Sequence, residues 1–349
     1  MNSGRAGRVT LDQVATAANV SVATASKVLN ARSGVSPTTR DRVLATMTQL
    51  GYRLTTARSA DDLARAVQLV FDSLDGSPYS AEILQGFVNA AREMGLIMHL
   101  DTLRPSPQPK THAAMDAWAA AMVGSAHLGL VFITCDLGPE EIEACKRLET
   151  PFIALDPRCL LDSGIVTVGS TNFGGGFAAT QHLLELGHRD IGLIAGLGRT
   201  TFAQERAYGF RSALADAGVA CREDLIRMGD FTYDSGLELG GELLDVAPRP
   251  TAIVVNCDTS AIGVIEAARR RRVRVPEDLS VVGFDDTKLA LWSTPQLTTV
   301  RQPLGDMARV ALRTVAQMAA GQQPDSPHTQ LATTLVVRGS TARPPARRR

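Results

Sequence analysis

Long hydrophobic runs are missing from this 349-residue chain: no stretch approaches the roughly 20 consecutive apolar residues that a helix needs to cross a bilayer. The N-terminus is polar and lacks the apolar segment of a secretory signal peptide. These absences argue against a membrane-spanning or exported protein. We therefore expect a cytoplasmic protein with no membrane partner.

Cysteine and histidine are scarce, and their spacing does not favour metal or disulfide chemistry. No CxxC pair occurs among the five cysteines, so we expect reduced thiols. The cysteines are Cys135, Cys145, Cys159, Cys221 and Cys257. The six histidines show no metal-ligand spacing, and His182 and His188 do not share a helix face. The sequence predicts no metal site and no cofactor.

The signatures of common enzyme classes are also missing. The glycine-rich segments 174–176 and 196–198 supply neither G-x-G-x-x-G nor a phosphate-binding loop with Lys and Ser/Thr. No nucleophile elbow is present, and no Ser/His/Asp set can be assembled from the sequence. Acidic residues at strand ends suit catalysis or polyol binding equally well. We do not expect an enzyme.

The neutral total charge conceals an uneven distribution. The chain has 36 Lys and Arg residues and 36 Asp and Glu residues. Between Met1 and Ala60 there are eight basic and two acidic residues, a net charge of +6, so residues 61–349 have a net charge of −6. Basic charge concentrated in one small segment indicates a polyanionic partner.

Residues 9–30 predict two helices joined by a tight turn. The apolar residues of the first helix fall at helical spacing: Leu11, Val14, Ala15 and Ala18. Asn19 tolerates the left-handed backbone of a sharp turn. Ser21 can cap the second helix. We expect its exposed face to be small and polar, with one cation: Val22, Ala23, Thr24, Ser26 and Lys27.

Apolar residues on one face of the second helix and of a third helix predict a three-helix core. In the second helix, the residues able to pack inward are Val20, Ala25, Val28 and Leu29. The third helix has Ser36 as its cap and Pro37 at its first position, and it stops at Gly51. Its predicted core face is Val43, Leu44, Met47 and Leu50. An ordinary helical hairpin is the alternative, but the local basic charge favours a helix-turn-helix that inserts its second helix into a DNA major groove.

Past residue 65, short apolar runs alternate with helical patterns. The predicted strands are Val67–Phe71, Leu96–Leu100, Leu128–Ile133, Phe152–Leu155, Ile191–Ala195, Ala252–Val255 and Ser280–Phe284. The predicted helices include Ala81–Met94, Glu140–Leu148, Gly175–Leu186, Ala203–Ala217 and Ser260–Arg271. This alternation is typical of α/β folds with parallel sheets. So many strands favour two lobes, with a cleft that closes around a small molecule.

Several segments resemble the lactose-repressor (LacI/GalR) family of bacterial transcription regulators. In the headpiece they are VTLDQVA, NVSVATASKVLN, VSPTTRDRVL and QLGYR. Further on they are GFVNAAREMG, HLLELGHRDIGLIAG, ERAYGFRSAL, VRVPEDLSVVGFDD, PQLTTVRQP and LVVRGST. The resemblance implies a helix-turn-helix headpiece and a two-lobed effector domain like a periplasmic binding protein. It also implies a nucleoid-associated repressor that binds a palindromic double-stranded operator as a homodimer under allosteric control by a small molecule. Activation of transcription is the alternative.

The resemblance also divides the chain. Residues 1–58 are the headpiece, 59–66 the hinge, 67–342 the effector-binding and dimerisation domain, and 343–349 a basic tail. Within the large domain, one subdomain takes 67–165 and 302–325, and the other takes 166–301 and 326–342. The tail has no leucine heptads, so we expect a dimer and not a coiled-coil tetramer.

By the same resemblance, three residues of the second helix read bases: Val22 and Ala23 in the two leading positions and Lys27 in the third. Residues expected to contact phosphates or support the helix are Thr10, Ser21, Thr24, Ser26 and Asn30, and Arg58 lies in the hinge. The hinge has Ala60 where relatives have a leucine that wedges into the minor groove, which predicts a weaker central kink. The alternative is that Leu54 or Leu63 takes the wedge role.

For the effector cleft, the resemblance implies seven residues: Pro78, Tyr79, Asp156, Arg206, Phe231, Cys257 and Asp285. Cys257 stands where the family often has the asparagine of an A-N-D motif, and a thiol is a poor hydroxyl partner. A sugar is the expected effector class, and a nucleobase or another metabolite is the alternative. A solute-binding protein without DNA function is a remote alternative, because such a protein needs an export signal and has no use for residues 9–58.

Overall fold

The computed structural model describes residues 11–29, 34–49, 65–74, 76–123, 128–148, 150–159, 164–198 and 200–345. The chain forms two compact units, Met1–Ser59 and Ala60–Arg349. The following predicted residues lie outside the described residues: Thr10 and Asn30, expected to contact phosphates or support the helix; Arg58 in the hinge; Ala60 at the position of the family's wedge leucine; and the alternative wedge residues Leu54 and Leu63. None of the helices in the described ranges has the length and apolar character that a bilayer crossing requires.

The first unit contains α1 (Leu11–Ala17), α2 (Val22–Leu29) and α3 (Pro37–Gln49). Its turn forms as expected: Asn19 has φ 52°, in the left-handed region. The Ser21 hydroxyl accepts from the Thr24 N–H at 3.1 Å, and the Ser36 hydroxyl accepts from the Thr39 N–H at 3.3 Å. These two side chains therefore cap the helices that follow them.

A small apolar core joins the three helices. Its buried residues are Val14, Ala15, Ala18, Ala25, Val28, Val43 and Met47. One expectation is wrong: Leu44 is 47% exposed instead of buried. Val43 and Met47 are four residues apart and share one helix face, whereas Leu44 lies about 100° further round the helix axis.

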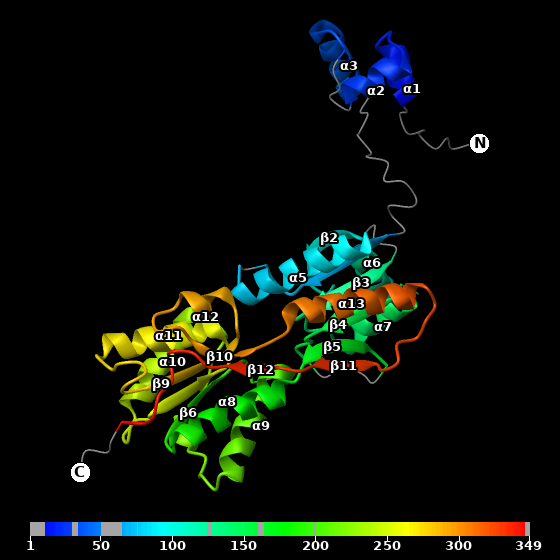
Figure 1. The fold of residues 1–349 in the computed structure, drawn as a ribbon. Helices are drawn as coiled ribbons and strands as arrows, with labels where there is room; N and C mark the ends of the chain where they lie inside the picture. Colours follow the sequence, from blue (N-terminus) through cyan, green and yellow to red (C-terminus); the bar gives the residue numbers. More distant parts are fainter. Residues whose placement is uncertain are drawn as a thin grey trace. The chain divides into compact units, whose positions relative to one another are not determined.

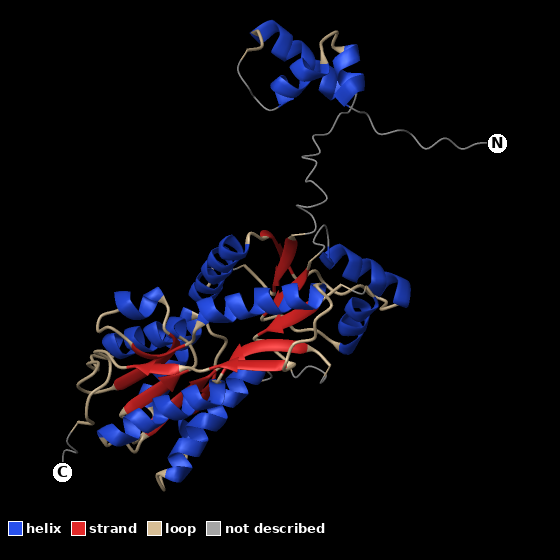
Figure 2. Cartoon of the chain, turned by 45° about the vertical axis from the view of Figure 1, so that its right-hand side comes forward, coloured by secondary structure: helices blue, strands red, loops and turns tan. Residues whose placement is uncertain are grey.

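The second unit contains two six-stranded sheets with helices on both faces (Figures 1 and 2). The first sheet has the order β11-β5-β4-β3-β1-β2, and all of its pairs are parallel. Its strands are β1 (Ala66–Phe71), β2 (Ile97–Thr102), β3 (Gly129–Ile133), β4 (Phe152–Leu155), β5 (Val166–Ser170) and β11 (His328–Leu331). Helices α5 (Pro78–Met94) and α13 (Leu304–Ala319) pack on one face. Helices α6 (His112–Val123) and α7 (Pro139–Arg147) pack on the other.

The second sheet has the order β12-β10-β9-β8-β6-β7, with one antiparallel pair, β10 with β12. Its strands are β6 (Ile191–Ala195), β7 (Ile226–Met228), β8 (Ala252–Val255), β9 (Ser280–Asp285), β10 (Thr298–Arg301) and β12 (Thr334–Val336). Helices α8 (Asn172–Leu186) and α9 (Thr201–Asp216) pack on one face. Helices α10 (Tyr233–Asp245) and α11 (Asp258–Arg270) pack on the other, near the short α12 (Lys288–Trp292); the 3₁₀ turn η1 (Glu223–Leu225) precedes β7.

The chain passes between the two lobes at residues 171, 302–303 and 332–333, which follow β5, β10 and β11. This corrects the subdomain limits drawn from the sequence, which assign 166–170 and 328–331 to the second lobe. Both strands belong to the first sheet, because β5 pairs with β4 and β11 pairs with β5. The sequence pattern missed these strands because β5 (VTVGS) and β11 (HTQL) are short and partly polar.

Candidate functional site

The exposed face of α2 is the first candidate site. Val22 is 44% exposed, and Ala23 and Lys27 are exposed as well. Thr24 and Ser26 are half-buried, while the exposed Ser21 lies just before the helix. Because Ala25 and Val28 are buried on the opposite side, the helix presents its predicted base-reading residues outward. This arrangement suits insertion into a major groove.

The second candidate site is a cavity of about 230 Å³ between the two lobes of the large unit. Its walls follow the carboxyl ends of the strands, where ligands bind in parallel α/β folds. Six of the seven predicted effector residues line it: Tyr79, Asp156, Arg206, Phe231, Cys257 and Asp285. Pro78 does not; it is the first residue of α5, and its neighbours Ser77 and Tyr79 form the wall.

Eleven further residues line the cavity and were not predicted from the sequence. They are Asp72, Ser73, Ser77, Ser80, Thr134, Arg158, Leu197, Phe202, Asp230, Thr232 and Thr259. Several directly follow strands: Asp72 follows β1, Thr134 follows β3 and Asp230 comes soon after β7. Position after a buried strand was therefore a usable signal for the acidic and hydroxyl residues. Phe202 and Arg158 give no comparable signal.

Four lining residues have left-handed backbone: Thr134, Asp156, Phe231 and Asp285, with φ of 53°, 45°, 70° and 110°. Each lies at or shortly after the end of a strand. Residues other than glycine adopt such conformations at a cost, and they persist where the surrounding structure holds them. Their concentration around one cavity supports a functional role for it.

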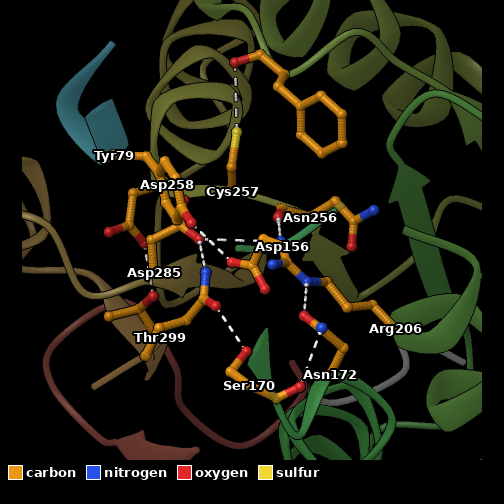
Figure 3. Close-up of polar contacts among 12 residues, drawn as sticks. Tyr79, Asp156, Ser170, Asn172, Arg206, Asn256, Cys257, Asp258, Asp285 and Thr299 are labelled. Atoms are coloured by element: carbon orange, nitrogen blue, oxygen red, sulfur yellow. Dashed lines mark hydrogen bonds and ion pairs between the residues drawn. The ribbon is translucent and has the colours of Figure 1, made fainter. Parts of the chain in front are cut away.

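Arg206, on α9, is buried and held from several sides (Figure 3). Its Nε donates to Asn172 Oδ1 at 2.9 Å, and its Nη1 donates to the Asn256 carbonyl oxygen at 2.6 Å. The guanidinium carbon lies 3.7 Å from the centre of the Phe284 ring, a cation–π contact. These contacts fix the plane of the guanidinium group before any ligand arrives.

Asp285 ends β9 and comes from the same lobe as Arg206. Its Oδ1 lies 3.8 Å from Arg206 Nη1 and accepts from Gln302 Nε2 at 2.7 Å. Gln302 Oε1 in turn accepts from the Ser170 hydroxyl at 2.6 Å. Burial raises the pKa of Asp285, although Arg206 and the Gln302 hydrogen bond act in the opposite direction.

Asp156 faces the cavity from the first lobe. Its Oδ2 accepts from the Tyr79 hydroxyl at 2.6 Å. Burial raises the pKa of the Asp156 carboxyl, and the Tyr79 hydrogen bond and the charge of Arg206 partly oppose that effect. The two lobes also meet beside the cavity, where the Thr201 N–H donates to the Arg158 carbonyl oxygen at 3.0 Å.

Cys257 is engaged within the protein. Its sulfur accepts from the Ser260 N–H and donates to the Phe231 carbonyl oxygen, both at 3.4 Å, so it caps α11. Burial raises the pKa of the thiol to about 12, which makes it a poor nucleophile. The next residue, Asp258, was not singled out from the sequence. It accepts from the Thr287 N–H at 2.7 Å and from the Thr299 hydroxyl at 2.5 Å, and thereby holds the loop after Asp285.

Comparisons with known proteins identify relatives of both units. Residues 10–54 match the family described as bacterial regulatory proteins, lacI family, and residues 180–341 match the periplasmic binding protein-like domain. Catabolite control protein A of Priestia megaterium is 32% identical over 95% of this chain and 99% of its own length. The HTH-type transcriptional regulator DegA of Bacillus subtilis is 33% identical over 96% of this chain and 98% of its own.

Solved structures give the same result. A transcriptional regulator CelR–cellobiose complex has a TM-score of 0.71 at 32% identity, covering 95% of this chain and all of that chain. The lac repressor dimer bound to operator and the anti-inducer ONPF has a TM-score of 0.70 at 26% identity, covering 96% of this chain.

Fold, helix-turn-helix and interlobe cavity together define a DNA-binding regulator with an effector domain like a periplasmic binding protein. The chain belongs to the LacI family of bacterial transcription regulators. The family resemblance and the α/β class expected from the sequence are thereby confirmed. Because these relatives are transcriptional regulators, the expectation that the chain is not an enzyme is confirmed too.

Proposed function

We propose that this protein represses transcription by binding a palindromic operator as a homodimer, and that a small hydroxylated molecule in the interlobe cavity controls this binding. The main support for DNA reading is the outward position of Val22, Ala23 and Lys27 above a buried core. The lac repressor dimer bound to its operator is a related solved structure. A two-fold symmetric pair of headpieces reads an inverted repeat, with half-sites about one helical turn apart.

Selection of bound sequences from a random pool of duplex DNA tests the DNA-binding part. We expect an inverted repeat whose half-sites are each read by one α2. Recovery of a single non-repeated site contradicts the dimer, and the absence of any enriched sequence contradicts the regulator assignment. Sedimentation equilibrium of the full chain measures the dimer independently of DNA.

The contact between protomers is expected in the large unit. Leu291 and Trp292, on α12, are 49% and 72% exposed, and large apolar side chains exposed side by side indicate an interaction surface. A Trp292→Asp change is expected to weaken dimerisation and, with it, operator binding. Unchanged dimerisation in this variant places the contact elsewhere on the large unit.

A sugar is the proposed effector class. Supporting this, Arg206 and Asp285 offer directional donors and acceptors for hydroxyl groups, and a related solved structure contains cellobiose. A nucleobase is the second candidate, favoured by the aromatic pair Phe202 and Phe231, whose ring centres are 5.7 Å apart. A thermal-shift screen of sugars and nucleosides separates the two, because only the true class stabilises the folded protein.

A further inference from the structure

Acidic side chains outnumber basic ones around the interlobe cavity. The four acids are Asp72, Asp156, Asp230 and Asp285, and the two cations are Arg158 and Arg206. Asp72 and Asp156 come from the first lobe, whereas Asp230 and Asp285 come from the second. The chemical character of the ligand depends on which of these charges are already paired.

Both cations are already engaged by protein groups. The Arg158 guanidinium forms an ion pair with Asp72. Two nitrogens of Arg206 donate to Asn172 and to the Asn256 carbonyl, and its plane lies against Phe284. A phosphate or carboxylate on the ligand would have to compete for these cations, next to a surplus of negative charge.

The two buried carboxylates are less well compensated. Asp156 accepts from the neutral Tyr79 hydroxyl, and Asp285 accepts from the neutral Gln302 amide. Among the described residues, the cation that forms an ion pair with Asp285 is Arg206, at 3.8 Å, which is longer than a hydrogen bond. Burial raises the pKa of both carboxyls, and the charge of Asp156 raises the pKa of Asp285 further. Like charges on opposite lobes thus oppose each other across the cavity.

We propose that the effector is a single hydroxylated ring bearing a protonated amine, which binds between Asp156 and Asp285, and that anionic ligands are excluded. This inference rests on the proposed effector role of the cavity. A cation between the two carboxylates replaces their repulsion with two attractions and so favours the closed arrangement of the lobes. The ring size follows from the volume of about 230 Å³, below the roughly 300–1,000 Å³ of pockets for drug-sized ligands. Phe202 and Phe231 supply apolar faces for the ring.

Isothermal titration of the full chain with matched hexoses tests the proposal. The probes are glucose, galactose and mannose, each as the neutral sugar, the 2-amino sugar, the uronic acid and the 6-phosphate. We expect at least one amino sugar to bind about tenfold or more tightly than its neutral parent, and the acid and phosphate to bind more weakly than the parent.

Two variants test whether Asp156 is the source of the preference for the amine. Asp156→Asn removes one carboxylate without changing the size of the side chain, and it is expected to bring the ratio of amine to neutral-sugar affinities to near parity. The matched control is Asp216→Asn, at the exposed C-terminal end of α9 outside the cavity, which is expected to leave the preference unchanged.

Tighter binding of an acid or a phosphate, equal binding of amine and neutral sugar, or no binding of any amine overturns the inference. Operator binding is measured in the same preparation. If the operator is bound and another small molecule modulates it, the regulatory function stands and only the amine inference fails. If no operator is bound, the proposed function itself fails.

Discussion

Gln302 contacts Asp285 twice: its Nε2 donates to Asp285 Oδ1 at 2.7 Å, and its backbone N–H donates to the Asp285 carbonyl oxygen at 3.3 Å. Gln302 lies on one of the segments that connect the lobes, and its Oε1 accepts from Ser170 at the end of β5 in the first lobe. A ligand that moves Asp285 therefore acts directly on the connection between the lobes.

Replacing Gln302 with leucine is expected to weaken allosteric control. The change removes both side-chain hydrogen bonds, so Asp285 loses its link to the first lobe. Allosteric coupling commonly amounts to about 1–3 kcal/mol, and we expect most of it to be lost. The measurement is the ratio of operator affinities with and without the ligand that gives the largest thermal shift. A purely structural role would lower stability without altering this ratio, and the exposed Gln322→Leu serves as the control.

Lys27→Ala is expected to cost about 1–3 kcal/mol of operator binding and to relax the preference at one base pair, because lysine reaches guanine acceptors in the major groove. Fluorescence anisotropy with operators changed at single positions measures this. Since Lys27 is exposed, the fold of the headpiece is expected to persist. An equal loss on all sequences would show that Lys27 contacts only phosphate.

Gly176→Ala is expected to destabilise the large unit by about 1–3 kcal/mol, because the added methyl group overpacks a close helix contact. An added Cβ would lie 2.2 Å from the Arg206 carbonyl oxygen, so α8 and α9 would have to separate. Ligand binding is expected to weaken as well, since Arg206 would move. Denaturant unfolding measures the stability. The control is Gly305→Ala in α13, where nothing lies within 4 Å of the added Cβ and a small gain in stability is expected.

The pH dependence of stability is expected to report on His188. This buried imidazole contacts the Thr251 hydroxyl at 2.8 Å and the Ala342 carbonyl oxygen at 2.9 Å, and burial lowers its pKa below 6.5. The imidazole of His188 therefore binds a proton more readily in the unfolded chain than in the folded protein. The contribution of His188 to the free energy of unfolding is therefore complete above about pH 6.5. This contribution is lost as the pH falls from there through the lowered pKa of the folded state, by at most about 1.4 kcal/mol per pH unit.

The check is a comparison of unfolding free energies between the wild type and His188→Gln from pH 8 to pH 5. The comparison isolates the histidine from buried carboxyls such as Asp285, whose raised pKa produces the opposite slope. We expect the gap between the two proteins to shrink as the pH falls. A gap that is constant with pH would show that His188 does not titrate differently in the folded and unfolded states.

Local chemistry allowed the sequence by itself to predict the headpiece and the α/β class. The left-handed turn at Asn19, the caps at Ser21 and Ser36, and the helical spacing of Val14, Ala15 and Ala18 all act within a few residues. Continuous apolar runs identified β1, β3, β4, β6, β8 and β9 within one or two residues, because buried parallel strands need apolar residues on both faces.

Only the tertiary structure decided to which lobe β5 and β11 belong and which charged side chains lie together around the cavity. β5 and β11 are short and partly polar, so only their pairing assigns them to the first sheet. The cavity brings together Asp156, Arg206 and Asp285, which lie far apart in the chain, and adds Phe202 and Arg158, which no local pattern marks. Burial and pairing set the balance of charge there, and both depend on how the two lobes pack, which residue order does not reveal.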